Sequence, residues 1–205
     1  NTGYVKAWVG GINHNYFQYD HTLSNRQVGS TFKPFVYAAA LEKGAEPCRF
    51  YENELRLYTD LKDWTPGNAD GDYGGEYSMR GALAKSVNTV SVQIMLETGV
   101  KKVVEFAKKL GIKSNIPEVP SIALGTAELT LNEMVSAYCA FPNGGYQTTA
   151  HYLTKVVDVN GRKYEYRPTH YKYRERAMEE ETAKLMMHMM EAVVDSGTAR
   201  RLRFR

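Results

Sequence analysis

Ser30 and Lys33 are the first residues of the chain whose types and spacing could do chemistry. They open a predicted helix over residues 30–43. Residues three apart share a helix face, and the helix start favours negative charge. A serine hydroxyl needs an adjacent base to act as a nucleophile, and burial can lower the pKa of a lysine enough for it to serve. The pair therefore indicates covalent catalysis, although about one Ser-x-x-Lys match is expected by chance in a chain this long. The alternative is a helix cap followed by a surface lysine.

Ser86-Val87-Asn88 is the second group that could do chemistry. It falls where a predicted helix over residues 78–84 breaks, before a second helical stretch that runs to about Glu97. Side chains two residues apart point the same way in an extended segment, so Ser86 and Asn88 would face a cleft while Val87 packs into the core. The hydroxyl could relay a proton, and the amide could hold a peptide group. The alternative, which this motif alone favours, is a polar interruption of a helix.

The elements that must position these residues are predicted from periodicity and turn signals. Helices are also expected over residues 101–110 and 179–194, and from the capping box Thr130-x-x-Glu133 to Asn143. Strands are expected over residues 4–9, 152–158 and 162–167, with Asn160-Gly161 as the turn between the last two, and residues 45–77 are expected to be loop. Because helices and strands do not alternate regularly, we expect one α+β domain over residues 1–205.

Composition narrows the function classes. The 205 residues are 43% hydrophobic and 24% charged, as is ordinary for a soluble globular protein. A net charge of +3 without a basic, aromatic-interleaved stripe does not indicate a nucleic-acid partner. Cys48 and Cys139 lie far apart, and the histidines show no ligand spacing, so no metal site is expected. The run 186–190 (Met-Met-His-Met-Met) is typical of a methionine-rich core helix rather than of a copper or haem site.

Several segments together resemble the transpeptidase domain of class A penicillin-binding proteins. Ser-x-x-Lys and Ser-x-Asn are two of the three motifs shared by penicillin-binding proteins and class A β-lactamases. The likeness runs in family order along nearly the whole chain, through Arg26-Gln27-Val28-Gly29-Ser30-Thr31-Phe32-Lys33-Pro34-Phe35-Val36-Tyr37, Trp64-Thr65-Pro66-Gly67-Asn68, Ser86-Val87-Asn88-Thr89-Val90, Ala123-Leu124-Gly125-Thr126 and Gly197-Thr198-Ala199. The third motif, Lys-Thr-Gly, does not occur. We therefore expect a domain truncated at both ends, without the Lys-Thr-Gly strand and the first strand of its sheet.

The resemblance implies a serine D,D-transpeptidase that cross-links peptidoglycan stem peptides. Ser30 would attack the carbonyl between two terminal D-alanines, and Lys33 would take its proton. Ser86 would relay a proton to the leaving D-alanine, and Asn88 would hold the acyl peptide. An amine of a second stem peptide would then resolve the acyl-enzyme. β-Lactams would acylate Ser30 as substrate mimics, and no cofactor or metal is implied.

The implied fold is the penicillin-binding protein/β-lactamase-like one, of which this chain would supply mostly the helical part and an incomplete central antiparallel sheet. The parent protein would carry a membrane anchor and a glycosyltransferase domain, and would act on the outer face of the bacterial cytoplasmic membrane. The chain alone would be inactive, with residues 4–9 short of sheet partners.

Three alternatives to the transpeptidase remain open. One is a β-lactamase or D,D-carboxypeptidase of the same fold, which would release the acyl group to water. Another is a non-catalytic β-lactam sensor domain that is acylated without turning over. The last is an inert structural fragment. The segments 64–68 and 124–126 favour the transpeptidase over the first of these.

Overall fold

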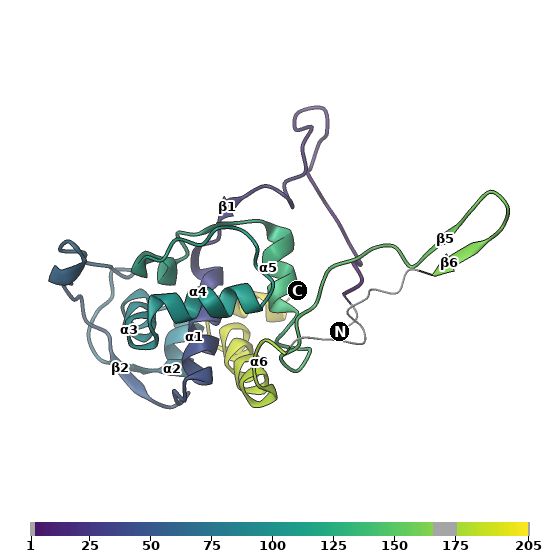
Figure 1. Cartoon of the computed structure of the whole chain (residues 1–205). Helices are drawn as coiled ribbons and strands as arrows, with labels where there is room; N and C mark the ends of the chain where they lie inside the picture. Colours follow the sequence, from purple (N-terminus) through teal and green to yellow (C-terminus); the bar gives the residue numbers. More distant parts are fainter. Residues whose placement is uncertain (1–2, 166–175, 205) are drawn as a thin grey trace.

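A computed structural model describes residues 3–165 and 176–204, in which helices hold many more residues than strands (Figure 1). Its α-helices are α1 (Lys33–Glu42), α2 (Met79–Lys85), α3 (Asn88–Thr98), α4 (Val100–Lys109), α5 (Leu131–Tyr138) and α6 (Glu180–Asp195). Short 3₁₀ turns cover Gly29–Phe32, Thr59–Leu61, Pro120–Leu124 and Arg200–Phe204. Its strands are β1 (Arg26–Gln27), β2 (Phe50–Glu52), β3 (Glu76–Ser78), β4 (Glu128–Leu129), β5 (Lys155–Val157) and β6 (Lys163–Glu165).

Helix α1 is the buried centre of the helical part. Every residue from Lys33 to Leu41 is buried, and the helix packs against α3, α4 and α6. A helix that is apolar on all sides belongs in a core rather than on a surface. Because Lys33 is the first residue of this helix, the apolar residues that follow carry its side chain into the interior.

The predicted helices are confirmed with small shifts of their ends. Helix α5 stops at Tyr138, before the predicted end at Asn143, and turns cover the residues between them. The methionine-rich helix α6 is also confirmed, with Met186 and Met189 buried. No helix in the described residues is long and apolar enough to cross a membrane.

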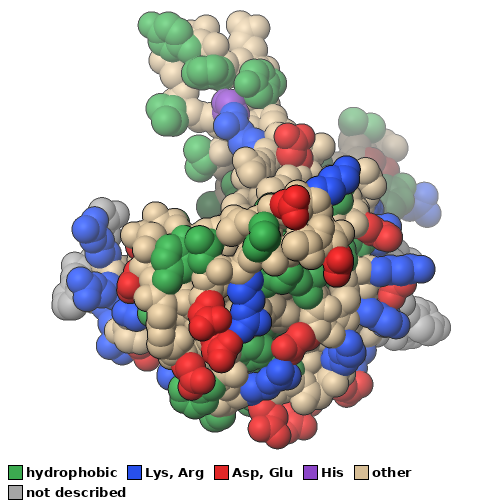
Figure 2. Space-filling view, turned by 90° about the vertical axis from the view of Figure 1, so that its left-hand side faces the viewer, with side chains coloured by type: hydrophobic (Ala, Val, Ile, Leu, Met, Phe, Trp, Pro, Cys, Tyr) green, Lys and Arg blue, Asp and Glu red, His purple; other side chains and the backbone are tan. Residues whose placement is uncertain are grey.

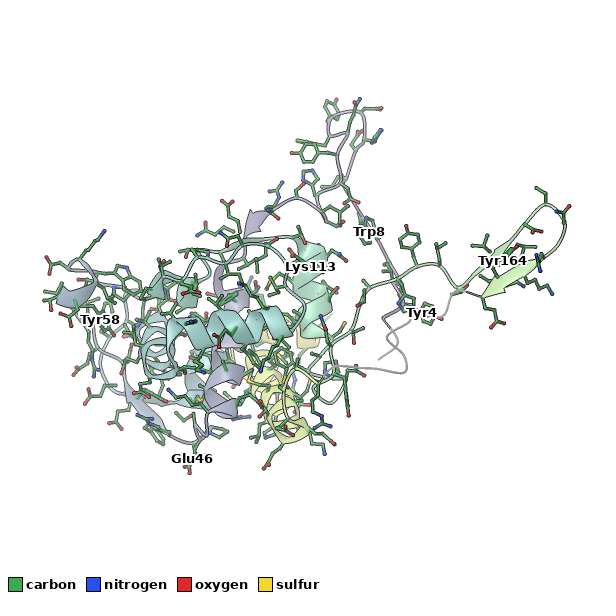
Figure 3. The ribbon with its side chains drawn as sticks, in the orientation of Figure 1. Tyr4, Trp8, Glu46, Tyr58, Lys113 and Tyr164 are labelled. Atoms are coloured by element: carbon green, nitrogen blue, oxygen red, sulfur yellow. The ribbon has the colours of Figure 1, made fainter. Side chains whose placement is uncertain are left out.

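The strand predicted over residues 4–9 is wrong. In the described residues this segment forms no strand, and its pairing is an isolated bridge between Tyr4 and His151, so the expectation of few sheet partners is confirmed. Val9 is 73% exposed, because the alternating apolar residues have no sheet to pack against. Figure 3 shows Tyr4 and Trp8 along this extended segment, away from the helices.

The prediction that residues 45–77 are all loop is wrong, because this segment contains β2 and β3, which pair antiparallel. Three-residue strands are too short to leave a periodic pattern in the sequence. Elsewhere β1 pairs with β4 and β5 with β6, so the described residues contain three two-stranded antiparallel sheets. The domain is therefore α+β, with helices dominating.

Two segments project from the helical part. One is the β5–β6 hairpin, which is confirmed around Asn160-Gly161 with shorter strands than predicted; residues 166–167 of the prediction lie outside the described residues. The other lies between residues 10 and 24, where Ile12, Tyr16 and Phe17 are exposed. Figure 2 shows hydrophobic side chains gathered on the projection at the top of the molecule.

The capping box at α5 is present as predicted. Thr130 Oγ1 accepts a hydrogen bond from Glu133 N at 3.1 Å, and Glu133 Oε2 accepts one from Thr130 N at 3.1 Å. The Glu133 carboxylate also accepts hydrogen bonds from Ser114 and from Lys113 N. Partial burial raises the pKa of Glu133, but these hydrogen bonds outweigh it and lower the pKa to about 2.

We expect Glu133→Gln to loosen the first turn of α5 in a pH-dependent way. A capping interaction of this kind contributes about 1 kcal/mol, or about fivefold in hydrogen-exchange rate. Because the folded-state pKa is depressed, the carboxylate's contribution is present above its ordinary pKa of 4.5 and is lost as pH falls toward about 2. Hydrogen exchange of α5, compared between wild type and variant at each pH, should show the difference shrink across that window. Glu105→Gln, on an exposed α4 position, is the control. A difference independent of pH would contradict this account.

Candidate active site

The four residues singled out in the sequence come together at one cleft. Ser30, Ser86 and Asn88 line a cavity of about 900 Å³. Lys33 is buried, and its Nζ contacts both polar residues of the second motif, Ser86 and Asn88. The other walls come from the segment between Asn68 and Asp72 and from residues 196–200.

Ser30 stands where a 3₁₀ turn runs into α1. The turn covers Gly29–Phe32, and Lys33 N donates to Ser30 O. Residues i and i+3 of a 3₁₀ turn are eclipsed, so Ser30 and Lys33 share one face. Ser30 is exposed to the cleft, and its N–H lies in a first turn, where intrahelical acceptors are missing. In the described part of the chain no hydrogen bond joins the side chains of Ser30 and Lys33.

Close backbone contacts hold the serine in place. Gly29 has φ of +57° and donates its N–H to Gly125 O at 2.9 Å. A Cβ on Gly125 would lie 1.7 Å from Gly29 O, so no other residue allows this approach without displacing the turn. On the other side of Ser30, Tyr138 Oη donates to Thr31 O at 2.7 Å. The 125–129 segment and α5 thus clamp the turn that carries Ser30.

Lys33 is an amine held inside the protein by three oxygens. Its side chain is buried, as the sequence led us to expect, at 1% exposure. Nζ donates to Ser86 O at 2.6 Å, to Ser86 Oγ at 2.9 Å and to Asn88 Oδ1 at 2.7 Å. Burial lowers the pKa of Lys33 from 10.5 to about 8. Part of the population is therefore neutral near physiological pH, and a neutral amine can accept a proton.

Ser86 adopts a conformation that the sequence interpretation missed. The motif is not an extended segment, because Ser86 lies in the left-handed region with φ of 58° and ψ of 39°. Ser86 N bonds Leu83 O, and Val87 N bonds Ala82 O, which is the Schellman pattern that ends α2. Glycine is the usual residue at this position, since a Cβ is strained there. A serine that accepts this strain is a signal of function, because its hydroxyl is what glycine would lack.

Asn88 begins α3 and has both ends of its amide engaged. Oδ1 accepts from Lys33, and Nδ2 donates to Gly67 O at 2.9 Å. Ser86 and Asn88 both line the cleft, as predicted, and across a helix junction they also contact the same Lys33 amine, which was not predicted. Val87 between them is 7% exposed and packs into the core, also as predicted.

Two asparagines at the site were not identified as functional from the sequence. Asn68 is only the last residue of the family-like segment 64–68, and Asn53 lies in the segment 45–77 that was predicted to be loop. Asn68 Oδ1 accepts hydrogen bonds from Asn88 N and Thr89 N. Asn53 is 2% exposed and accepts from Asn68 Nδ2. Nothing in their local sequence marks these contacts, because both partners lie in distant segments.

The last wall of the cleft is fastened to α2. A Cβ on Gly197 would lie 2.1 Å from Ala84 O, and Thr198 N donates to the same oxygen. Lys85 Nζ donates to Ser196 O at 3.2 Å.

Within the described residues no group of three or more His, Cys, Asp or Glu side chains is placed to hold a metal ion. A cleft serine beside a buried amine of lowered pKa is an arrangement suited to acyl transfer.

Comparison with known proteins assigns the family. The model of the penicillin-binding protein transpeptidase domain matches residues 1–204, and the chain belongs to this family. Penicillin-binding protein 1A of Neisseria meningitidis is 36% identical over 97% of this chain, and that of Rickettsia felis is 37% identical over 79%. The chain spans only 26% and 21% of these two relatives.

Solved structures show the same fold. The crystal structure of penicillin-binding protein 1A from Haemophilus influenzae superposes with a TM-score of 0.86 at 26% identity, over 94% of this chain and 35% of that one. The PonA1 protein of Mycobacterium tuberculosis, solved in complex with penicillin V, has a TM-score of 0.81 at 26% identity, over 94% and 53% of the two chains. The predicted α+β penicillin-binding fold is confirmed.

Proposed function

We propose that this chain supplies the nucleophile, the base and the proton relay of a peptidoglycan D,D-transpeptidase that β-lactams acylate. The observation that carries the proposal is the buried Lys33 amine beside the cleft of Ser30, bound to both polar residues of the second motif. Family membership and the penicillin complex of a structural relative support it.

The contacts of Lys33 suggest how the proton moves. An ammonium has three N–H donors, and all three are used by the oxygens of Ser86 and Asn88. The neutral amine has two N–H groups and a lone pair. It can then accept the proton of the Ser30 hydroxyl as the oxygen attacks the acyl carbonyl. The Ser30 N–H, at the helix start, would stabilise the resulting oxyanion.

Collapse of the tetrahedral intermediate would break the bond to the terminal D-alanine and leave the donor peptide on Ser30 Oγ. The proton held by Lys33 would pass through the Ser86 hydroxyl, 2.9 Å from Nζ, to the departing amine. The amine of a second stem peptide would then attack the ester and restore Ser30. Asn88 would hold the acyl peptide with the Nδ2 hydrogen that Gly67 O does not use. β-Lactams would acylate Ser30 by the same first step, the attack of the Ser30 oxygen on a carbonyl.

For the whole protein we propose the cellular location and the second activity that the resemblance to class A penicillin-binding proteins implies. It would be membrane-anchored, would work on the outer face of the bacterial cytoplasmic membrane, and would carry a glycosyltransferase activity in addition to the transpeptidase. D-Ala-D-Ala stem peptides would be the donors, and an amine of a neighbouring stem peptide would be the acceptor.

Ser30→Ala is expected to abolish penicillin labelling of the complete product of the gene, because the acylated oxygen is removed. Mass spectrometry of the wild-type adduct should place the penicilloyl group on Ser30. Thr31→Ala alters the neighbouring hydroxyl, whose only hydrogen bond in the described residues is to Val28 O, and should still label. An adduct on another residue would refute the assignment of Ser30.

Lys33→Arg keeps the positive charge but cannot lose a proton at working pH. If Lys33 is the base, the acylation rate should fall by at least about a hundredfold, within the range for loss of a general base. Rates are measured with a fluorescent penicillin and compared with those of Lys43→Arg, which follows the last residue of the same helix. A rate for Lys33→Arg within a few-fold of wild type would mean that the residue is only a positive anchor.

A further inference from the structure

The start of α3 lacks a cap of its own. Val87 precedes the helix in the extended conformation that a capping residue adopts, but its side chain is apolar and accepts no hydrogen bond. The first N–H groups of a helix have no intrahelical acceptor and must be satisfied from elsewhere. At this helix the missing acceptor matters, because the first residue is Asn88, whose side chain binds Lys33.

Asn68 supplies the acceptor from a loop twenty residues earlier in the chain. Its Oδ1 accepts from Asn88 N at 2.9 Å and from Thr89 N at 3.2 Å. Its Nδ2 donates to Asn53 Oδ1 at 2.7 Å and to Asp72 O at 2.8 Å. The oxygen and both N–H groups of this amide are thus satisfied, and the reverse orientation would set N–H groups against N–H groups.

Asn53 anchors the loop beneath Asn68. It is buried, and its Oδ1 also accepts from Thr89 Oγ1 at 2.8 Å. Its backbone bonds Gly75 O and Gly74 N, which ties the loop to the end of β2. Gly67, which precedes Asn68 in the chain, accepts a hydrogen bond from Asn88 Nδ2 at its carbonyl oxygen. The loop therefore holds both the backbone and the side chain of Asn88.

We propose that Asn68 is a positioning residue for the acyl-transfer site, which caps α3 from the loop and so holds the Asn88 amide oxygen against the Lys33 amine. This inference rests on the proposed function. The hydrogen bonds run from Asn68 Oδ1 to Asn88 N, and from Asn88 Oδ1 to Lys33 Nζ. Asn68 itself needs no contact with the reacting atoms.

The test separates positioning from folding. The complete product of the gene is treated with a fluorescent penicillin, and the limiting acylation rate is resolved from the dissociation constant of the non-covalent complex. Asn68→Ala should lower the limiting rate by at least about tenfold, because small displacements of catalytic groups cost that much or more. The dissociation constant should stay within about twofold, since Asn68 is only one of the residues that line the cleft and Ser30 is unchanged.

Ser78→Ala is the matched control. Ser78 Oγ caps α2 by accepting from Gly81 N at 3.1 Å, and in the described residues it has no hydrogen bond to Lys33 or Asn88. Loss of either cap should lower the melting temperature by a similar amount. Only Asn68→Ala should slow acylation. Equal acylation rates for the two variants would overturn the inference.

A rescue variant covers the case in which Asn68→Ala does not fold. Val87 already has the backbone conformation of a cap, and Val87→Thr places a hydroxyl there at nearly constant volume. Combined with Asn68→Ala, it should restore the acylation rate to within about threefold of wild type if capping is the role. A folded double variant that stays slow, or the failure of both variants to fold, would overturn the inference. Absence of labelling in wild type would instead refute the proposed function, and the inference with it.

Discussion

The burial of the Lys33 ammonium against three oxygens is the interaction on which the rest of the site depends. A charged amine in a core is costly unless hydrogen bonds satisfy it. Here one side-chain amide, one hydroxyl and one carbonyl do so, all from the junction between α2 and α3. The same burial lowers the pKa of Lys33, so the environment that binds the ammonium also allows it to lose a proton.

Several local features follow from that requirement. The junction must present Ser86 O, Ser86 Oγ and Asn88 Oδ1 to one point, and an uninterrupted helix would not bring all three there. Ending α2 with a left-handed Ser86 turns the chain sharply enough, at the cost of strain that glycine would avoid. Restarting the helix at Asn88 leaves N–H groups that Val87 cannot satisfy, and the 64–75 loop satisfies them. The left-handed Ser86 and the capping of α3 by Asn68 thus both follow from the way the α2–α3 junction presents three oxygens to Lys33.

Much of this was predictable from the sequence because it is encoded locally. The helix start at Ser30, its spacing to Lys33 and the capping box at Thr130 are set by residues within one helical turn of each other. The left-handed Ser86 was not predictable, because serine rarely occupies that region without tertiary support. The β2–β3 pairing and the contacts of Asn68 were missed for another reason, since their partners are separated by long stretches of sequence. The strand predicted over residues 4–9 is wrong because alternating apolar residues form a strand only where a neighbouring strand is available to pair with.

The most direct measurement of the central claim is the pH dependence of the second-order rate constant for acylation by a β-lactam that does not itself titrate between pH 6 and 10. This constant reports the ionisation of the free enzyme. A base that must be neutral makes the rate rise with pH through its own pKa. If Lys33 is the base, the rise should be centred near pH 8, the value to which burial lowers the pKa of Lys33. A rate that is flat through this region, or that rises only near the ordinary lysine value of 10.5, would contradict it.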